Sequence, residues 1–211
     1  MKRILICGCA RSGNTLMLHL MGTGFENTEI LYDGPGGEVM PRKEDEKEGK
    51  AIVGKFPKKA GKLEKWLDNE EFGAIYMMRD PRDVLVSKHF LKPKRYWVPT
   101  KRWIDAAKIA EELQGKERIL MVSYEELLSD PKKVQEEIAS AFGLSIAIPF
   151  EKCHEHFDQD DQTNISNMNG ARPLDPGRIG NWKNDPAKKK HIEKRLKDVE
   201  LVKYMKKFGY V

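Results

Sequence analysis

The chain has 211 residues, of which 34% are charged and 39% hydrophobic, and its 38 Lys and Arg exceed its 33 Asp and Glu to give a formal net charge of +5. This length and balance are typical of a soluble globular protein, and we expect one domain over residues 1–211. The composition excludes a membrane-spanning class, because no apolar run approaches the length of a bilayer-crossing helix. The positive charge favours an anionic partner, either nucleic acid or an anionic cofactor.

The three cysteines, Cys7, Cys9 and Cys153, bear on the compartment. Their number and spacing match neither a disulfide framework nor a set of metal ligands, so we expect a reducing, cytoplasmic location and no metal site. The apolar start of the chain is interrupted by polar residues from Arg11 to His19. It therefore predicts neither a signal peptide nor a membrane anchor.

The first predicted elements surround a glycine-rich loop. The apolar run at residues 2–8, "KRILICG", predicts a buried strand, and residues 14–21 place their apolar side chains on one face of a helix. Residues 8–15 between them have the glycine spacing and the final Thr of a phosphate-binding P-loop, but Asn14 stands where the motif requires Lys. That Lys contacts the β- and γ-phosphates of a nucleoside triphosphate, so its absence argues against ATP or GTP.

A loop without this lysine keeps part of its function. Its backbone amides and the positive end of the following helix bind a phosphate group whatever the side chains are. Arg11, earlier in the loop, offers a permanent cation with a planar fork of donors. The alternative is a plain glycine-rich turn with an exposed Arg.

The remaining elements alternate between strands and helices. A charged, Gly- and Pro-rich surface segment at 33–50 precedes predicted strands at 50–56, 73–80 and 118–124, a helix that begins at Asp130-Pro131 and ends at Gly143, a polar loop at 158–176 and further helix at 186–210. This order predicts an α/β protein with a P-loop-like three-layer fold, in which a central parallel sheet is flanked by helices.

A second constellation follows the strand at 73–80. That strand runs into Arg79, then Asp80-Pro81, and then a predicted helix that carries Ser87 two turns on. Arg79 and Ser87 could converge on one anionic group at the carboxyl ends of the strands, where open α/β sheets bind ligands. In the alternative interpretation, Arg79 simply forms an ion pair with Asp83.

A third piece, "DPGRIGNWKND" at residues 175–185, places Arg178 between glycines in a loop. Glycines beside a cation allow close backbone approach to an anion, although a plain turn explains them equally well.

Together these motifs resemble those of the sulfotransferases that use 3′-phosphoadenosine 5′-phosphosulfate (PAPS). "ARSGNT" is similar to the family's 5′-phosphosulfate loop, "RDPRDVLVS" and "GRIGNWKN" to its two 3′-phosphate elements, and "MVSYEELL" to its Tyr-Glu-x-Leu segment. The four pieces occur in the family's order. The resemblance implies that the cofactor-binding residues are Arg11, Ser12, Gly13, Asn14, Thr15, Arg79, Ser87, Tyr124, Arg178, Ile179 and Gly180.

The resemblance also implies a reaction. A sulfuryl group would move in line from PAPS to an acceptor hydroxyl or amine, leaving adenosine 3′,5′-bisphosphate (PAP), with no metal and with Arg11 stabilising the leaving phosphate. Small-molecule members of the family take the proton with the His of a Lys-x-His stretch, but "VGKFPKK" here holds Lys55 and no His. Tyrosyl-protein members use a Gly-Glu segment, which "GGEVMPR" resembles, so Glu38 is the candidate base. A solvated Glu38 is the equal alternative, and His89 and Lys55 are the next candidates.

Two other functions stay open. A P-loop kinase of small metabolites would need Lys at position 14 and an acidic Mg²⁺ partner, whereas a non-catalytic module on the same fold would bind anions or nucleic acid without chemistry. "KPKRYWVPTKRW" at 92–103 fits an acceptor-binding loop or a nucleic-acid patch, and we favour the acceptor. Lys188, Lys189 and Lys190 are interpreted as a solvated helix face. The sequence leaves the acceptor and the oligomeric state undetermined.

Overall fold

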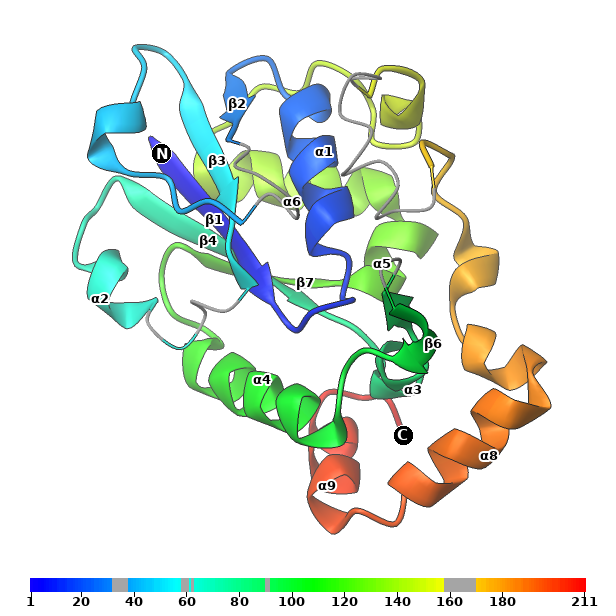
Figure 1. The fold of residues 1–211 in the computed structure, drawn as a ribbon. Helices are drawn as coiled ribbons and strands as arrows, with labels where there is room; N and C mark the ends of the chain where they lie inside the picture. Colours follow the sequence, from blue (N-terminus) through cyan, green and yellow to red (C-terminus); the bar gives the residue numbers. More distant parts are fainter. Residues whose placement is uncertain (32–37, 58–60, 62, 90–91, 158–169) are drawn as a thin grey trace.

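A computed structural model describes residues 1–31, 38–57, 61, 63–89, 92–157 and 170–211 (Figure 1). Its centre is a sheet of parallel strands in the order β2-β3-β1-β4-β7. These strands are β1 (Arg3–Gly8), β2 (Thr28–Ile30), β3 (Ala51–Lys55), β4 (Phe72–Met78) and β7 (Ile119–Ser123). The predicted α/β class with a central parallel sheet is confirmed.

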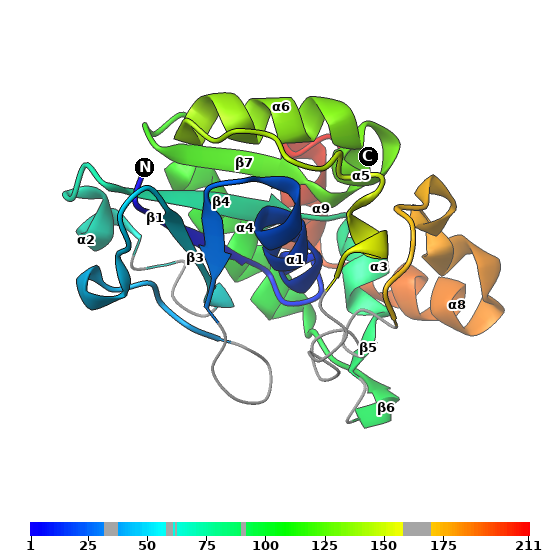
Figure 2. The same ribbon diagram turned by 90° about the horizontal axis from the view of Figure 1, so that it is seen from above.

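Helices cover both faces of the sheet, which makes three layers (Figures 1 and 2). One face carries α1 (Asn14–Gly24) and α6 (Pro131–Phe142), and the other carries α4 (Thr100–Leu113) and α9 (Val199–Lys207). Because side chains alternate along a strand, Ile4 and Ile6 of β1 pack with α1 and α6, while Leu5 packs toward α4. A strand buried on both faces reads as a continuous apolar run, which is why β1 was predictable.

Shorter elements connect and flank these strands and helices. They are α2 (Glu64–Leu67), α3 (Pro81–Leu85), α5 (Tyr124–Ser129), α8 (Pro186–Arg195), a hairpin of β5 (Lys88–His89) and β6 (Lys92–Tyr96), and 3-10 turns at Lys43–Asp45, Cys153–Glu155, Pro176–Arg178 and Asn181–Asn184. Across the described residues, no helix combines the length and the apolar character needed to cross a bilayer.

The structure differs from the sequence-based expectations in several of its outer elements. The hairpin β5–β6 and the edge strand β2 were not predicted. The helical stretch predicted at 186–210 is two helices, because Asp198 interrupts it and its carboxylate caps α9 by accepting bonds from the amides of Glu200 and Leu201 at 3.0 and 3.1 Å.

The strand order determines where a crevice for a ligand opens. β1 lies between β3 and β4, so the chain first crosses to one side of β1 and later to the other. The loops that leave β1 and β4 therefore diverge at their carboxyl ends and open a crevice, as in other doubly wound sheets. The glycine-rich loop after β1 and Arg79 after β4 both lie at this edge.

Candidate active site

The glycine-rich loop between β1 and α1 is held by close backbone contacts. A side chain at Gly8, where φ is 127°, would place its Cβ 2.3 Å from the carbonyl oxygen of Met77 on β4. Gly13 has a φ of 95° and begins α1 without a side-chain cap. The first amides of α1 are therefore not occupied by a capping side chain of the described residues, which is the arrangement that binds anions at helix N-termini.

Asn14, which stands in place of the P-loop lysine, forms a hydrogen bond within the loop. Its Nδ2 donates a hydrogen bond to the carbonyl of Cys9 at 2.8 Å, and its side chain is almost fully buried. Asn14 thus closes the loop on itself. The cation comes from another strand: Lys55, the last residue of β3, is 4% exposed, and its Nζ donates to the hydroxyl of Thr15 at 3.0 Å.

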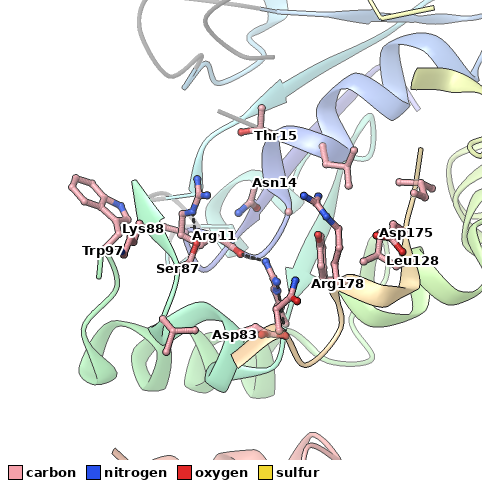
Figure 3. Close-up of a pocket in the computed structure, with 18 of the residues that line it drawn as sticks. Arg11, Asn14, Thr15, Asp83, Ser87, Lys88, Trp97, Leu128, Asp175 and Arg178 are labelled. Atoms are coloured by element: carbon pink, nitrogen blue, oxygen red, sulfur yellow. Dashed lines mark hydrogen bonds and ion pairs between the residues drawn. The ribbon is translucent and has the colours of Figure 1, made fainter. Parts of the chain in front are cut away.

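Arg11 and Ser87 meet on one side of the loop (Figure 3). Arg11 has the left-handed φ of 70° and directs its Nε to the Ser87 Oγ at 2.9 Å. Burial, and next the nearby Arg79, lower the pKa of Arg11, yet an arginine stays charged at any physiological pH. The predicted position of Ser87 on a helix was wrong, because α3 ends at Leu85 and Ser87 follows it in the turn before β5.

Arg79 connects the loop to the end of β4. Its Nη1 donates to the carbonyl of Arg11 at 3.2 Å, and its guanidinium lies 4.1 Å from the ring centre of Tyr124. Tyr124 also packs under Gly13, where a Cβ would come within 2.7 Å of the ring. The buried Nε of Arg79 has no hydrogen-bond partner among the described residues. A buried donor without a partner is costly, so this nitrogen is a position where a ligand oxygen would be stabilised.

Asp83 holds the late glycine-rich loop against α3. Its carboxylate is almost fully buried and accepts hydrogen bonds from the amides of Gly180 at 2.8 Å and Trp182 at 3.0 Å. An oxygen of the same carboxylate lies 3.9 Å from Arg79 Nη2. The ion pair that we weighed as the alternative function of Arg79 is therefore present, but Asp83 is shared with two backbone amides.

These elements enclose one cleft of about 790 Å³. Its walls carry more positive than negative charge, and Figure 3 shows Arg11 and Arg178 on opposite sides of Asn14. The basic lining residues are Arg11, Lys55, Arg79, Lys88, Arg102, Arg172, Arg178 and Lys188, and the acidic ones are Glu38, Asp83, Asp175 and Asp185. Asp83, Asp175 and Asp185 accept hydrogen bonds from backbone amides of the chain itself.

Most of the predicted site residues line this cleft. They are Arg11, Gly13, Asn14, Thr15, Glu38, Arg79, Ser87, Tyr124 and Arg178. Ser12, Ile179 and Gly180 are not among the lining residues: the Ser12 side chain is fully buried, and the Gly180 amide is used by Asp83. Glu38 is half-buried. The side chain of His89, the alternative base, lies outside the described residues, as do Gly36 and Gly37 before Glu38.

Sequence reasoning did not assign Lys55 or Arg172 to the cofactor site. Lys55 is the last residue of a buried strand, and the carboxyl ends of parallel strands meet at one edge of a sheet, so its position predicted that it lies at the ligand-binding edge but not that it contacts Thr15. Arg172 lies in the irregular segment before the 3-10 turn at Pro176–Arg178 and belongs to no sequence motif. Burial, and next the neighbouring Arg178, lower the pKa of Arg172, which shows how closely the cations of the cleft are grouped.

The cysteines take no part in the cleft. Cys7, Cys9 and Cys153 are free and buried. Burial raises the pKa of Cys9 to about 12, against a smaller opposing effect of Arg102, and it also raises the pKa of Cys153 to about 12. These thiols stay protonated and are not candidate nucleophiles.

Comparison with known proteins decides the family. The family described as "Sulfotransferase domain" matches residues 58–200, which is more than half of the chain. The chain belongs to the sulfotransferase family. The match includes Arg79, Ser87 and the late glycine-rich loop, whereas the first loop, at residues 8–15, precedes it.

Solved structures extend this likeness over the whole sulfotransferase fold. The sulfotransferase domain of the curacin biosynthetic pathway is 13% identical with a TM-score of 0.69, and the match covers 100% of this chain and 98% of that one. The sulfotransferase domain of the Synechococcus PCC 7002 olefin synthase is 15% identical (TM-score 0.65, 100% and 94% covered). Mouse sulfotransferase SULT7A1, solved in complex with PAP, is 15% identical (TM-score 0.65, 97% and 85% covered). No curated protein sequence matches the chain significantly.

Proposed function

We propose that this sulfotransferase transfers a sulfuryl group from PAPS to an acceptor hydroxyl or amine. The observation that carries the proposal is the replacement of the P-loop lysine: Asn14 closes the loop, and Lys55 brings a buried cation to Thr15 from the neighbouring strand. A phosphosulfate presents no triphosphate chain and no β,γ-bridge, so it needs a cradle with local cations rather than the lysine and Mg²⁺ of a kinase. The PAP complex of the mouse fold neighbour supports the same donor.

The cleft offers two groups of donors for the two charged ends of PAPS. The amides of residues 11–15, the Arg11 guanidinium, the Thr15 hydroxyl and Lys55 suit the 5′-phosphosulfate. The second group suits the 3′-phosphate and consists of Arg79, whose Nε has no partner among the described residues, and Arg178. Ser87 connects the two groups, because its hydroxyl accepts a hydrogen bond from Arg11. Ser12, Ile179 and Gly180 contribute through the backbone that they shape, and Tyr124 supports Arg79 and Gly13.

The proposed transfer needs stabilisation of charge and removal of one proton. The acceptor oxygen forms a new bond to sulfur while the bond from sulfur to the bridging 5′-phosphate oxygen breaks, and PAP leaves with the electron pair. Arg11 and Lys55 stabilise the negative charge that grows on the bridging oxygen. Glu38, which lines the cleft, accepts the proton of the acceptor hydroxyl. The chemistry requires no metal ion.

The first test concerns Arg79 and the donor's identity. Charge-assisted hydrogen bonds to phosphate contribute about 1.5 to 3 kcal/mol, so Arg79→Ala should weaken PAP binding by about 10- to 100-fold and adenosine 5′-phosphate binding only slightly. Calorimetric titration of both nucleotides measures this difference, with Arg42→Ala, an exposed arginine of the 3-10 turn, as the control. Equal losses of affinity for the two nucleotides would contradict the assignment of Arg79 to the 3′-phosphate.

The same titrations separate enzyme classes. Wild-type protein should bind PAP without divalent metal and should not bind ATP with Mg²⁺ more tightly than PAP; the opposite order would favour a kinase. Transfer of labelled sulfate from PAPS to any member of a panel of phenols, sugars and tyrosine peptides separates an enzyme from an anion-binding module. The buried free thiols fit a reducing compartment, and we propose a cytoplasmic location on that ground.

Glu38→Gln tests the base. It should lower turnover by roughly 10²-fold and leave PAP affinity unchanged, because general-base catalysis contributes at least this factor and Glu38 faces the acceptor. An acceptor with a more acidic hydroxyl, already partly ionised, should recover most of the rate. Full activity of Glu38→Gln on a poorly acidic alcohol would assign the proton to another group, and Lys55→Met would be the next variant.

A further inference from the structure

The positive charge of this protein is concentrated in one short segment. Residues 186–197, which contain α8, hold six basic residues (Lys188, Lys189, Lys190, Lys194, Arg195 and Lys197) and one acidic residue, Glu193. The segment therefore has a formal net charge of +5, which equals the charge of the whole chain. The rest of the chain is neutral on balance.

The cations of α8 have no carboxylate partner within the described part of the protein. On the other helices lysines form ion pairs: Lys101 with Asp105 on α4, Lys133 with Glu126 near α6, and Lys207 of α9 with Glu111. Among the described residues, no Lys or Arg of α8 forms an ion pair with a carboxylate. Arg195 instead donates a hydrogen bond from Nε to the Nε2 of His191 at 3.3 Å. Uncompensated charges on one helix repel one another, so a helix of this kind is best stabilised by an external anion.

The position of α8 connects these charges to the cleft. Ile192 is buried and fixes the helix, Lys188 lines the cleft, and the His191 ring lies 4.5 Å from the ring of Tyr96 on β6. The hairpin therefore lies beside α8. The hairpin carries the exposed Lys94 and Arg95 on β6. Lys88 of β5 and Trp97, which follows β6, line the cleft. We call Lys88, Lys94, Arg95, Lys188, Lys194 and Arg195 the cationic strip: they are cations of α8 and the hairpin, two elements joined by the contact of His191 with Tyr96, and Lys88 and Lys188 of this set line the cleft.

We propose that the cationic strip binds the sulfate acceptor and that the acceptor is an acidic oligosaccharide. This inference rests on the proposed sulfuryl transfer. Each unit of an acidic sugar chain carries a negative charge, which the cationic strip can bind, and a hydroxyl, which can enter the cleft. The chain can thus bind in several registers and still present a hydroxyl to Glu38 and Arg11.

The surface favours a sugar chain over an acidic peptide. Peptide recognition uses a free strand edge or apolar pockets for anchoring side chains. The exposed large hydrophobic residues of the described part are Ile146, Ile179, Val199 and Val211, and none belongs to the strip. The half-buried rings of Tyr96, which contacts His191 of α8, and of Trp97, which lines the cleft, lie beside these cations, and flat aromatic rings with a polar edge suit the faces of sugar rings.

The test uses galacturonate oligomers and the same oligomers after carboxyl reduction, which removes the charge and keeps the hydroxyls. PAP-loaded protein should bind the acidic oligomer about tenfold or more tightly than the neutral one, and added salt should weaken this binding because exposed charges are screened. In the quadruple variant Lys94→Gln, Arg95→Gln, Lys194→Gln, Arg195→Gln, the affinity for the acidic oligomer should fall by about tenfold and come close to that for the neutral one. Each exposed contact contributes a fraction of 1 kcal/mol. The variant should keep the PAP affinity of the wild type.

The matched control removes the same charge elsewhere. Lys132→Gln, Lys133→Gln, Lys203→Gln and Lys206→Gln change exposed lysines of α6 and α9 and should leave oligomer binding unaltered. Failure of PAP binding in the wild type would reject the proposed function itself. Intact PAP binding with equal affinity for acidic and neutral oligomers would overturn the acceptor inference alone. Tighter binding of polyuridylate or of phosphatidylserine vesicles than of the galacturonate oligomer would also overturn it, and would assign the strip to nucleic acid or to a membrane surface.

Discussion

Arg11→Ala should lower the turnover of sulfuryl transfer by about 10²- to 10³-fold, which is the usual loss when a donor to a developing negative charge is removed. The affinity for PAP should fall much less. Arg11 lies in the loop that suits the leaving phosphate, and its bond to Ser87 at 2.9 Å fixes the direction of the guanidinium before any ligand binds. A preorganised cation of this kind acts on the charge that grows during transfer more than on the charge that is already present.

The measurement pairs steady-state turnover with PAP titration. Arg11→Lys is the informative companion variant, because it keeps the charge and loses the planar fork that reaches Ser87. We expect its turnover to lie between those of the wild type and Arg11→Ala. If Arg11→Ala lost affinity and turnover in the same proportion, Arg11 would be a ground-state contact only, and Lys55 would become the principal stabiliser of the bridging oxygen.

Asp83→Ala should lower the free energy of unfolding by about 3 to 5 kcal/mol, the usual cost of removing one partner of a buried charge pair. The carboxylate accepts two backbone amides of the late glycine-rich loop and lies 3.9 Å from Arg79. Removing it takes the acceptor from the amides of Gly180 and Trp182 and the nearby carboxylate of Asp83 from Arg79. For a chain of this size the melting temperature should fall by about 10 °C.

Differential scanning calorimetry and nucleotide titration together check this prediction. Asp83→Asn keeps the shape and one acceptor oxygen, so its loss of stability should be smaller, about 1 to 3 kcal/mol. Because Asp83 positions the loop that carries Arg178, this variant should lose more affinity for PAP than for adenosine 5′-phosphate. Asp175→Ala is the matched control, since that carboxylate is exposed and accepts a bond from the amide of a single neighbouring residue, Gly177, among the described residues. Equal stability of the two alanine variants would contradict the buried role of Asp83.

The central layers of this fold were predictable because their signals are local. β1, β3 and β4 are buried on both faces and read as short apolar runs. The start of α6 was predictable because Asp130 caps its amides and Pro131 fits its first turn. The hairpin β5–β6 could not be found in this way, since "KPKRY" has no apolar alternation and contains the charges and the proline that are typical of exposed edges.

The site was predictable as a set of motifs but not as a set of contacts. Arg11, Arg79 and Arg178 stood in recognisable patterns, and all three line the cleft. The contact of Lys55 with Thr15 depends on which strand pairs beside β1, and no local pattern encodes that order. Ser87 was placed on a helix because "PRDVLVS" has helical spacing, whereas α3 ends early and the turn after it brings the hydroxyl to Arg11.

The strand order also governs how the chain reaches its native state. β1 is synthesised before its partners, which are β3 at residues 51–55 and β4 at residues 72–78. Its apolar side chains, buried in the native protein, therefore stay exposed until those distant strands are made, and parallel pairings of this kind form slowly because a long loop must close first. During refolding from denaturant, an unpaired β1 is free to meet the same strand of another molecule. Recovery of native protein should consequently decline as the protein concentration in the refolding mixture rises.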